Sequence, residues 1–263
     1  MSVSAEGITL QANASEGPWT EPAAALAAIS HGTSSAHGQA VVAALAEQVA
    51  QAARGAEKVT QVKLGHVDVQ QPDIAATLDS LPEGTPAVLV PLLLSAGFHV
   101  NVDMREAVED TARPVTIAGA MGPDERLVKA LAQRLSEAGA DPQRDQIVLG
   151  GAGSSDTSAQ ADVRETAEML ADFLGAPVTA SFLSFAEPTV ADAVAEARAA
   201  APGGRVAIAS YLLAPGYFQD KLGAQGADLV TEPLLSIPDG TPDIPAGLAE
   251  MVLDRFAEAL TSL

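Results

Sequence analysis

Short apolar runs alternate with helix-like stretches along the whole chain. An apolar strand is predicted at 23–29, and the next helix is predicted at 39–53, where Val41, Leu45 and Val49 recur at helical spacing. The alternation continues with strands at 59–67, 87–94 and 115–118, and with helices at 72–81, from Asp103 as N-cap, and at 124–138. Because parallel strands are joined by helical crossovers, this order predicts an α/β fold with helices on both faces of a parallel sheet.

The same order begins again near Gln146, which predicts an internal duplication. Strands are expected at 147–151, 178–183, 206–213 and 227–234, with helices at 160–174, from Pro188, at 217–222 and at 244–263. Three turns of the first half have counterparts at nearly constant separation: HGTS matches AGSS, LLSAGF matches LLAPGY, and Asp68 matches Ser184. We therefore expect two similar flavodoxin-like domains, 23–140 and 146–263, after a flexible leader at 1–22.

Three polar side chains follow neighbouring strands of the first half. His31 follows the first strand, Asp68 the second and His99 the third. Since ligands bind beyond the carboxyl ends of parallel strands, these side chains are expected to face one crevice. Two imidazoles and a carboxylate suit a divalent ion such as Fe²⁺ or Co²⁺, and imidazoles also suit proton transfer near neutrality. A histidine at a strand end can equally cap a turn, and Asp68 can be a turn residue.

The duplication provides an internal control on that interpretation. The second half keeps the turns but carries Ala152, Ser184 and Phe218 in place of the three polar residues. If the polar residues only held the turns together, the second copy would need them too. The comparison favours a single functional site in the first half.

Two further histidines lie near this region. His37, close to the start of the first helix, is expected to be solvated or to cap the helix, with at most a minor site role. His66 lies two residues before Asp68 and hence on the same strand face. It is expected at the rim of the site, with a role as third metal ligand left open.

Composition narrows the classes of partner. Hydrophobic residues make up 48% of the chain, enough for a core, and the formal charge is −20. No basic cluster could hold nucleic acid, and an anionic membrane would repel the chain. There is no cysteine, which excludes disulfides and thiolate metal sites. The N-terminal residues lack the pattern of a signal peptide and no apolar run is long enough to span a membrane, so a cytoplasmic location is expected.

Two competing motifs are weaker. The stretch GGAGSSD after a strand could cradle a phosphate, but the third glycine of a dinucleotide fingerprint is missing. A nucleotide-binding α/β protein thus stays an alternative. Ser34 and Ser35 near His31 raise the alternative of a hydrolase, yet no nucleophile elbow is present, and helix capping explains serines there.

The stretches ISHGTSSAHG, VDVQQP and PLLLSAGFHVNVD together resemble the sirohydrochlorin chelatases, the small class II chelatases of sirohaem and cobalamin biosynthesis. The stretches GAGSSD, FLSFAEP and YLLAPGYFQDKL resemble the degenerate second domain of two-domain members. The resemblance implies a tetrapyrrole held in the cleft between the domains. It also implies ATP-independent insertion of Fe²⁺ or Co²⁺ into sirohydrochlorin, with the metal as substrate and no organic cofactor.

Carried onto matching positions, the resemblance implies that His31 and His99 bind the metal and accept protons. Asp68 stands where such proteins usually have Glu, and it is one methylene shorter. The implied substrate-binding residues are Gly32, Thr33, Ser34, Ser95, Gly97, Phe98 and Arg105. Lys63 and Lys221 are further cations that could offset the charge of a polyanionic substrate. We expect a monomer or weak homodimer, and a non-catalytic metal or tetrapyrrole carrier using the same histidines remains the alternative.

Overall fold

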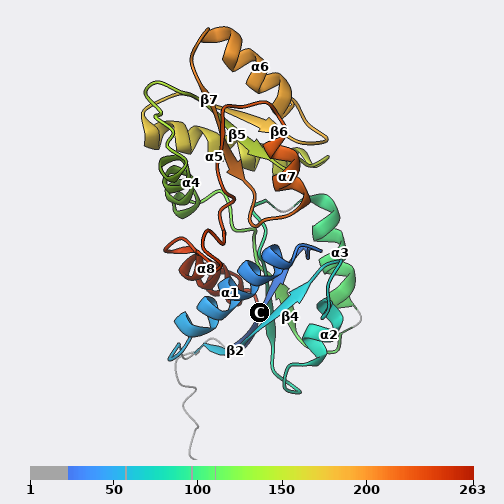
Figure 1. Ribbon diagram of the computed structural model, residues 1–263. Coiled ribbons are helices and arrows are strands. Elements are labelled where there is room, and N and C mark those ends of the chain that lie inside the picture. Colours follow the sequence, from blue (N-terminus) through green and yellow to red (C-terminus); the bar gives the residue numbers. More distant parts are fainter. Residues whose placement is uncertain (1–22, 57, 96, 110) are drawn as a thin grey trace, which may run out of the picture.

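The computed structural model describes residues 23–263 except residues 57, 96 and 110, and for residues 98–101 it describes the backbone alone. The predicted leader, residues 1–22, lies outside the described residues. Figure 1 shows two α/β lobes, one above the other. Among the helices of the described segments, none has both the length and the apolar composition that a bilayer crossing requires.

Strands and helices alternate through both halves of the chain. The first half contains β1 (Ala24–Ser30), α1 (Ala36–Ala52), β2 (Val59–His66), α2 (Ile74–Asp79), β3 (Ala87–Pro91), α3 (Phe98–Glu109), β4 (Val115–Ile117) and α4 (Glu125–Glu137). The second contains β5 (Gln146–Gly151), α5 (Thr157–Leu174), β6 (Val178–Phe182), α6 (Val190–Ala200), β7 (Val206–Tyr211), α7 (Tyr217–Gly223), β8 (Leu229–Val230) and α8 (Leu248–Leu260).

The two sheets have the same topology. The strand order is β2-β1-β3-β4 in one and β6-β5-β7-β8 in the other, and every pairing is parallel. The predicted fold class, two similar parallel α/β units from an internal duplication, is confirmed. Parallel pairing points the carboxyl ends of all strands of a sheet to one edge, which is where the turns after β1, β2 and β3 meet.

The central strand β1 is buried along its whole length. Ala24, Leu26 and Ala28 belong to a core shared with residues of α1 and α8, whereas Ala25 and Ile29 pack with residues of α2 and α3 on the other face. Burial on both faces explains why this strand is an unbroken run of small and branched apolar residues rather than an alternating one.

Several helix boundaries differ from those predicted. The helix expected to open at a proline, 72–81, begins at Ile74 because the Asp73 carboxylate accepts the N–H of Ala76. The helix expected from Asp103 begins at Phe98, so Asp103 lies inside α3 rather than at its cap. This earlier start places the backbone of residue 99 in the first turn of a helix. The strand expected at 227–234 is only the two-residue β8.

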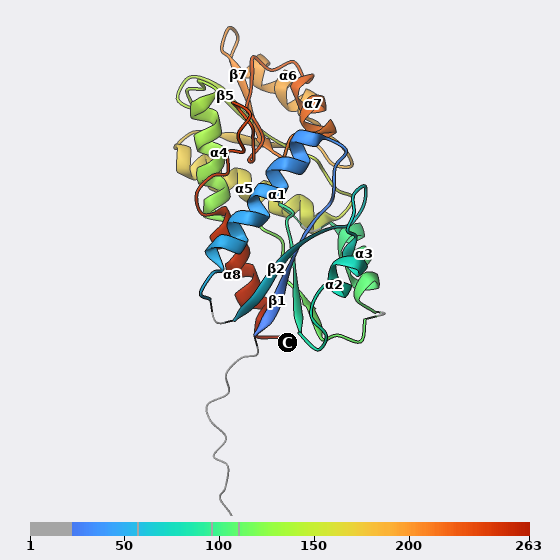
Figure 2. The same ribbon diagram turned by 60° about the horizontal axis from the view of Figure 1, so that its bottom comes forward.

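The last helix of each half packs against the sheet of the other half. Helix α4 contacts α5 and β7, whereas α8 contacts α1, β3 and β4. Figures 1 and 2 show α8 beside α1 in one lobe and α4 beside α5 in the other. One apolar core therefore runs through both lobes and includes Leu131 of α4 and Phe256 of α8. The division of the chain at 140 and 146 stays a proposal about its sequence, and in space the halves exchange these helices.

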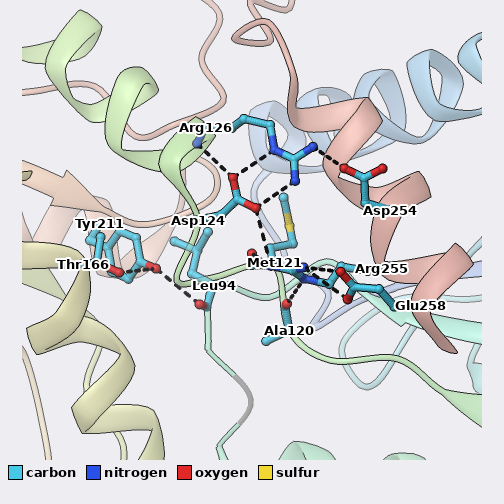
Figure 3. Close-up of polar contacts among 10 residues, drawn as sticks. All are labelled: Leu94, Ala120, Met121, Asp124, Arg126, Thr166, Tyr211, Asp254, Arg255 and Glu258. Atoms are coloured by element: carbon cyan, nitrogen blue, oxygen red, sulfur yellow. Dashed lines mark hydrogen bonds and ion pairs between the residues drawn. The ribbon is translucent and has the colours of Figure 1, made fainter. Parts of the chain in front are cut away.

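Charged side chains join the exchanged helices. The Asp124 carboxylate caps α4 and accepts from the backbone N–H, Nε and Nη2 of Arg126 at 2.8–2.9 Å. Arg126 also pairs with Asp254 of α8, and Arg255 of α8 lies 3.5 Å from Asp124. Arg255 donates as well to the carbonyl oxygens that precede α4, at Ala120 and Met121 (Figure 3). Burial alone would raise the pKa of Asp124, but the hydrogen bonds and charge of Arg126 with the charge of Arg255 hold it below its ordinary value.

This network predicts a specific loss of stability in acid. Because the pKa of Asp124 is lower in the folded than in the unfolded chain, its contribution is complete above the ordinary value of 3.8 and is lost as the pH falls through the folded value. We expect the free energy of unfolding, measured with urea from pH 6 to pH 3, to fall less steeply in Asp124→Asn than in the wild type. The matched variant Asp172→Asn, at an exposed position of α5, should follow the wild type. Parallel curves for Asp124→Asn and the wild type would contradict this assignment.

Candidate functional site

A cavity of about 620 Å³ lies where the carboxyl ends of the two sheets meet. This volume is in the range of small-molecule and cofactor sites. Its walls come from both halves: the turns after β1, β2 and β3, and the matching turns after β5, β6 and β7. The first-half residues in its lining include Ser30, His31, Gly32, Thr33, Ser34, Val69, Ser95 and Gly97, and the second-half residues include Gly153, Ser154, Ser155, Phe185, Tyr211, Tyr217 and Phe218.

The turn that carries His31 depends on a close backbone contact. Gly32 has φ +94°, and a Cβ there would collide with the carbonyl oxygen of Asp68. The second half repeats the arrangement at Gly153, with φ +89° and the carbonyl oxygen of Ser184 in the same place. Only a residue without a side chain fits this backbone conformation and this contact together. The contact fixes the path of the chain on both sides of His31.

The two halves also touch across the cavity floor. A Cβ on Gly97, after β3, would come within 2.9 Å of the Ser154 hydroxyl oxygen in the turn after β5. In the symmetric position, a Cβ on Gly216 would lie 3.3 Å from the Thr33 hydroxyl oxygen. The first-half turn is therefore braced by the second half, and the reverse holds as well.

Several of the predicted site residues meet in this cavity. Those lining it are His31, Gly32, Thr33, Ser34, Ser95 and Gly97. His31 is exposed there. Thr33 donates its backbone N–H to the Gln70 side chain at 2.9 Å, and its hydroxyl oxygen accepts the N–H of Ser35 at 3.1 Å. That hydroxyl keeps its own hydrogen for a ligand.

Other predicted site residues lie elsewhere or cannot be placed. The Asp68 carboxylate is exposed, is not part of the cavity lining and accepts the N–H of Val69 at 2.7 Å, as a turn residue does. Arg105, on α3, is exposed and also absent from the lining. The side chains of Phe98 and His99 lie outside the described part of the structure. No three His, Cys, Asp or Glu side chains that the structure describes are grouped to hold a metal ion, so the trio of His31, Asp68 and His99 stays a prediction.

His66 is not at the rim of the site, contrary to expectation. It is 4% exposed, and its Nδ1 lies 2.8 Å from the hydroxyl oxygen of Ser30, which lines the cavity. Burial lowers its pKa, which favours the neutral imidazole. The sequence pattern placed it on the strand correctly but could not show that helix α2 covers that end of β2.

The described lining contains no Asp, Glu, Lys or Arg side chain, in a protein whose formal charge is −20. Lys63 is exposed on β2 and absent from the lining, and Lys221 donates to the carbonyl oxygen of Leu183 at 3.1 Å. The cations that were expected to offset a polyanionic ligand are therefore not among the walls of the cavity. A ligand meets hydroxyls, backbone and apolar surface instead.

A carboxylate stands at the helix start that follows the GGAGSSD turn. Asp156 is the N-cap of α5, and its carboxylate accepts the N–H of Ser158 at 2.9 Å. This carboxylate takes up one of the donors of the helix terminus and repels an anion where a phosphate would bind. This geometry disfavours the nucleotide-binding alternative.

A family model described as CbiX matches residues 25–138 and 146–229. The chain belongs to the CbiX family. The match takes in the cavity turns of both halves, and it agrees with the resemblance to sirohydrochlorin chelatases that those turns carry in the sequence.

Named relatives and solved structures agree with the CbiX assignment. A sirohydrochlorin ferrochelatase of Priestia megaterium is 29% identical over 156 residues, which are 56% of this chain and 58% of that protein. The chain thus spans little more than half the length of that curated relative. The structure of SirB from Bacillus subtilis with Fe³⁺ has a TM-score of 0.75 at 21% identity and covers 91% of this chain and 96% of its own. SirB from Bacillus subtilis subspecies spizizenii in complex with cobalt gives a TM-score of 0.67 at 18% identity, with the same coverage. At these identities the two structures establish a shared fold.

The second half of this CbiX-family chain supplies a buried tyrosine that sequence reasoning missed. Tyr211, at the end of β7, is 3% exposed and donates its hydroxyl across the halves to the carbonyl oxygen of Leu94 at 3.3 Å (Figure 3). The Thr166 hydroxyl lies 3.1 Å from the same oxygen. Burial raises the pKa of Tyr211, so the hydroxyl remains a donor. A Cβ on Gly122 would collide with the Tyr211 hydroxyl, so that glycine leaves room for the bond.

Removal of this hydroxyl is expected to weaken the join between the halves. In Tyr211→Phe the buried Leu94 carbonyl loses its donor, which should lower the free energy of unfolding by about 1–2 kcal/mol in urea denaturation at pH 7. Tyr217→Phe removes the other tyrosine hydroxyl of the chain, at a site that is 73% exposed. This control variant should change the free energy of unfolding by less than about 0.5 kcal/mol. If both variants lowered the free energy of unfolding equally, the hydrogen bond between Tyr211 and Leu94 would make no specific contribution to stability.

Proposed function

We propose that this protein inserts a divalent metal ion, Fe²⁺ or Co²⁺, into sirohydrochlorin without ATP, in the cavity between its two halves. The observation that carries the proposal is the cavity itself, because its turns lie within the segments that match the CbiX family and an exposed imidazole, His31, is in its lining. The names of the relatives, a sirohydrochlorin ferrochelatase and SirB structures with Fe³⁺ and with cobalt, support the same substrate and the elements iron and cobalt. Sirohaem or cobalamin biosynthesis would be the setting.

The reaction exchanges protons for a metal. Insertion of one divalent ion removes two protons from the pyrrole nitrogens of the macrocycle, so the site must deliver the cation and accept protons. A neutral imidazole can ligate a metal or take a proton, and a protonated imidazole can do neither. In this proposal His31 and His99 are the metal-binding and proton-accepting pair. Helix α3 carries residue 99 in its first turn, directly after the lining residue Gly97.

The remaining lining residues would hold the macrocycle. Hydroxyl groups at Thr33, Ser34 and Ser95 can donate to its carboxylates, and Gly32 and Gly97 let the backbone approach the flat ring. Ser154 and Ser155 give equivalent hydroxyls from the second half. Arg105 and Phe98 stay predicted substrate contacts, and Asp68 a predicted metal ligand. The metal is a substrate in this scheme, and no organic cofactor takes part.

A chelation assay tests the proposal directly. Purified protein is mixed with sirohydrochlorin and Co²⁺ or Fe²⁺, and insertion is followed by the change in absorbance above the spontaneous rate. We expect His31→Ala and His99→Ala each to lower kcat about a hundredfold, which is typical for the loss of one acid–base group. His37→Ala is the matched control, because His37 is exposed in the first turn of α1 and absent from the lining.

Two results would contradict the proposal. Full rates in both variants would remove the histidines from the mechanism. A wild type that binds sirohydrochlorin and metal but does not exceed the spontaneous rate would instead indicate a carrier.

A further inference from the structure

Large apolar side chains that are exposed gather around the cavity. Within the described residues five such side chains are exposed, namely Val69, Phe173, Phe185, Tyr217 and Phe218. Four of the five line the cavity, and Phe173 alone lies elsewhere. Single exposed apolar residues are common on protein surfaces, but a group of them at one concave site marks a place where a ligand binds.

Two of these residues are held in a backbone conformation that side chains disfavour. Val69 has φ +66° and Phe185 has φ +62°. They are the positive-φ residues other than glycine that the structure describes. A β-branched residue such as valine in this region is a true outlier. The conformation therefore carries strain at both positions.

The strain occurs at equivalent places in the duplicated turns. Val69 follows Asp68 and Phe185 follows Ser184, the residues whose carbonyl oxygens contact Gly32 and Gly153. Each turn then closes in the same way, through the N–H of Gln70 on the Asp68 carbonyl and the N–H of Ala186 on the Ser184 carbonyl, at 2.7 and 2.8 Å. The fold thus forces the same conformation at two positions and places an apolar side chain at each.

Packing within the protein does not explain these side chains. Val69 is 58% exposed and Phe185 is 78% exposed, so neither gains much from burial. Glycine would adopt the same φ without strain and would leave the turn intact. Strained residues that contribute little to the folded core are found where a ligand uses them.

We infer that Val69 and Phe185 are substrate-contact residues whose apolar side chains, projecting from strained turns of the two halves, hold the flat macrocycle of the substrate in the cavity. The inference rests on the proposed function, since it takes the ligand to be a tetrapyrrole. A conjugated ring presents broad apolar faces, and the described cavity lining has no Lys, Arg, Asp or Glu side chain to bind it by charge. Contact with apolar side chains is then the main attraction available to the ring.

The neighbouring rings of Tyr217 and Phe218 extend the apolar contact surface. Their centroids are 5.5 Å apart with an interplanar angle of 73°, an edge-to-face contact between two residues of α7 that both line the cavity. Tyr217 and Phe218 therefore offer further aromatic surface from the second half. Val69 is the exposed large apolar side chain that the first half adds at the same site, beside less exposed leucines of the lining.

The test separates strain from binding. Val69→Gly, Phe185→Gly and the double variant are compared with the wild type in thermal unfolding and in calorimetric binding of metal-free sirohydrochlorin. Because glycine relieves the strain, we expect each melting temperature to stay equal or rise. Because the apolar contact is lost, we expect Kd for the metal-free macrocycle to rise about tenfold in each single variant and about a hundredfold in the double variant. Phe173→Ala removes the exposed apolar side chain outside the cavity and should leave Kd unchanged.

Asparagine variants at the same two positions keep the test valid if the glycine variants unfold. Asparagine tolerates this backbone region and replaces the apolar group with a polar one. They should weaken binding as the glycine variants do. An unchanged Kd in folded glycine and asparagine variants would overturn the inference. A melting temperature lowered by several degrees in the glycine variants would also overturn it, since the side chains would then be structural.

Failure of this inference differs from failure of the proposed function. If the wild type accelerates insertion and the variants bind as well as it does, the inference alone is wrong. If the wild type binds the macrocycle without accelerating insertion, and the variants bind it more weakly, the inference stands and the chelatase function is wrong. A wild type that does not bind the macrocycle would remove both.

Discussion

The contact between a glycine and the carbonyl oxygen of the neighbouring strand's turn organises the site in both halves. Gly32 meets Asp68 and Gly153 meets Ser184, in each case where a Cβ would not fit. This contact constrains the chain directly after His31, and the residue after each contacted carbonyl, Val69 or Phe185, has a positive φ. An imidazole in the cavity wall and a strained apolar side chain thus lie on either side of the same steric contact. The same contact occurs in both halves of the duplicated chain, but only the first half carries a histidine before the glycine.

Charge imposes the second constraint. An acidic protein repels an anionic ligand, and dissolved salt screens this repulsion at separations greater than the Debye length. The described cavity wall is free of carboxylates, so the repulsion is not concentrated where the ligand binds. Arg126 and Arg255 pair with acidic residues across α4 and α8, and Arg134 of α4 pairs with Asp243 in the segment before α8. These three arginines join the two halves, and none of them is in the described cavity lining.

The sequence was sufficient for the features that depend on local pattern. Unbroken apolar runs located the strands, Asp124 located the start of α4, and the repeated HGTS and AGSS turns located two of the cavity walls. What it could not show depends on contacts between distant residues. Nothing near Tyr211 indicates that its hydroxyl reaches Leu94, and nothing near His66 indicates that α2 covers it. Val69 and Phe185 could have been noticed as a repeat pair, but a conformation that side chains disfavour has no signature in a valine or a phenylalanine. The carboxylate at Asp68 was assigned to a metal on resemblance, whereas its described hydrogen bond is that of a turn.

The exchange of α4 and α8 has a consequence for how the molecule unfolds. Each sheet is covered on one face by a helix that belongs, along the chain, to the other repeat. If the chain were cut between residues 140 and 146 and the halves were separated, each half would have a sheet without its covering helix and a helix without a surface to pack on. Because each repeat relies on a helix of the other to cover its sheet, we expect the two sheets to unfold together. We then expect the cavity between the repeats to persist until the whole molecule unfolds, because neither repeat unfolds separately.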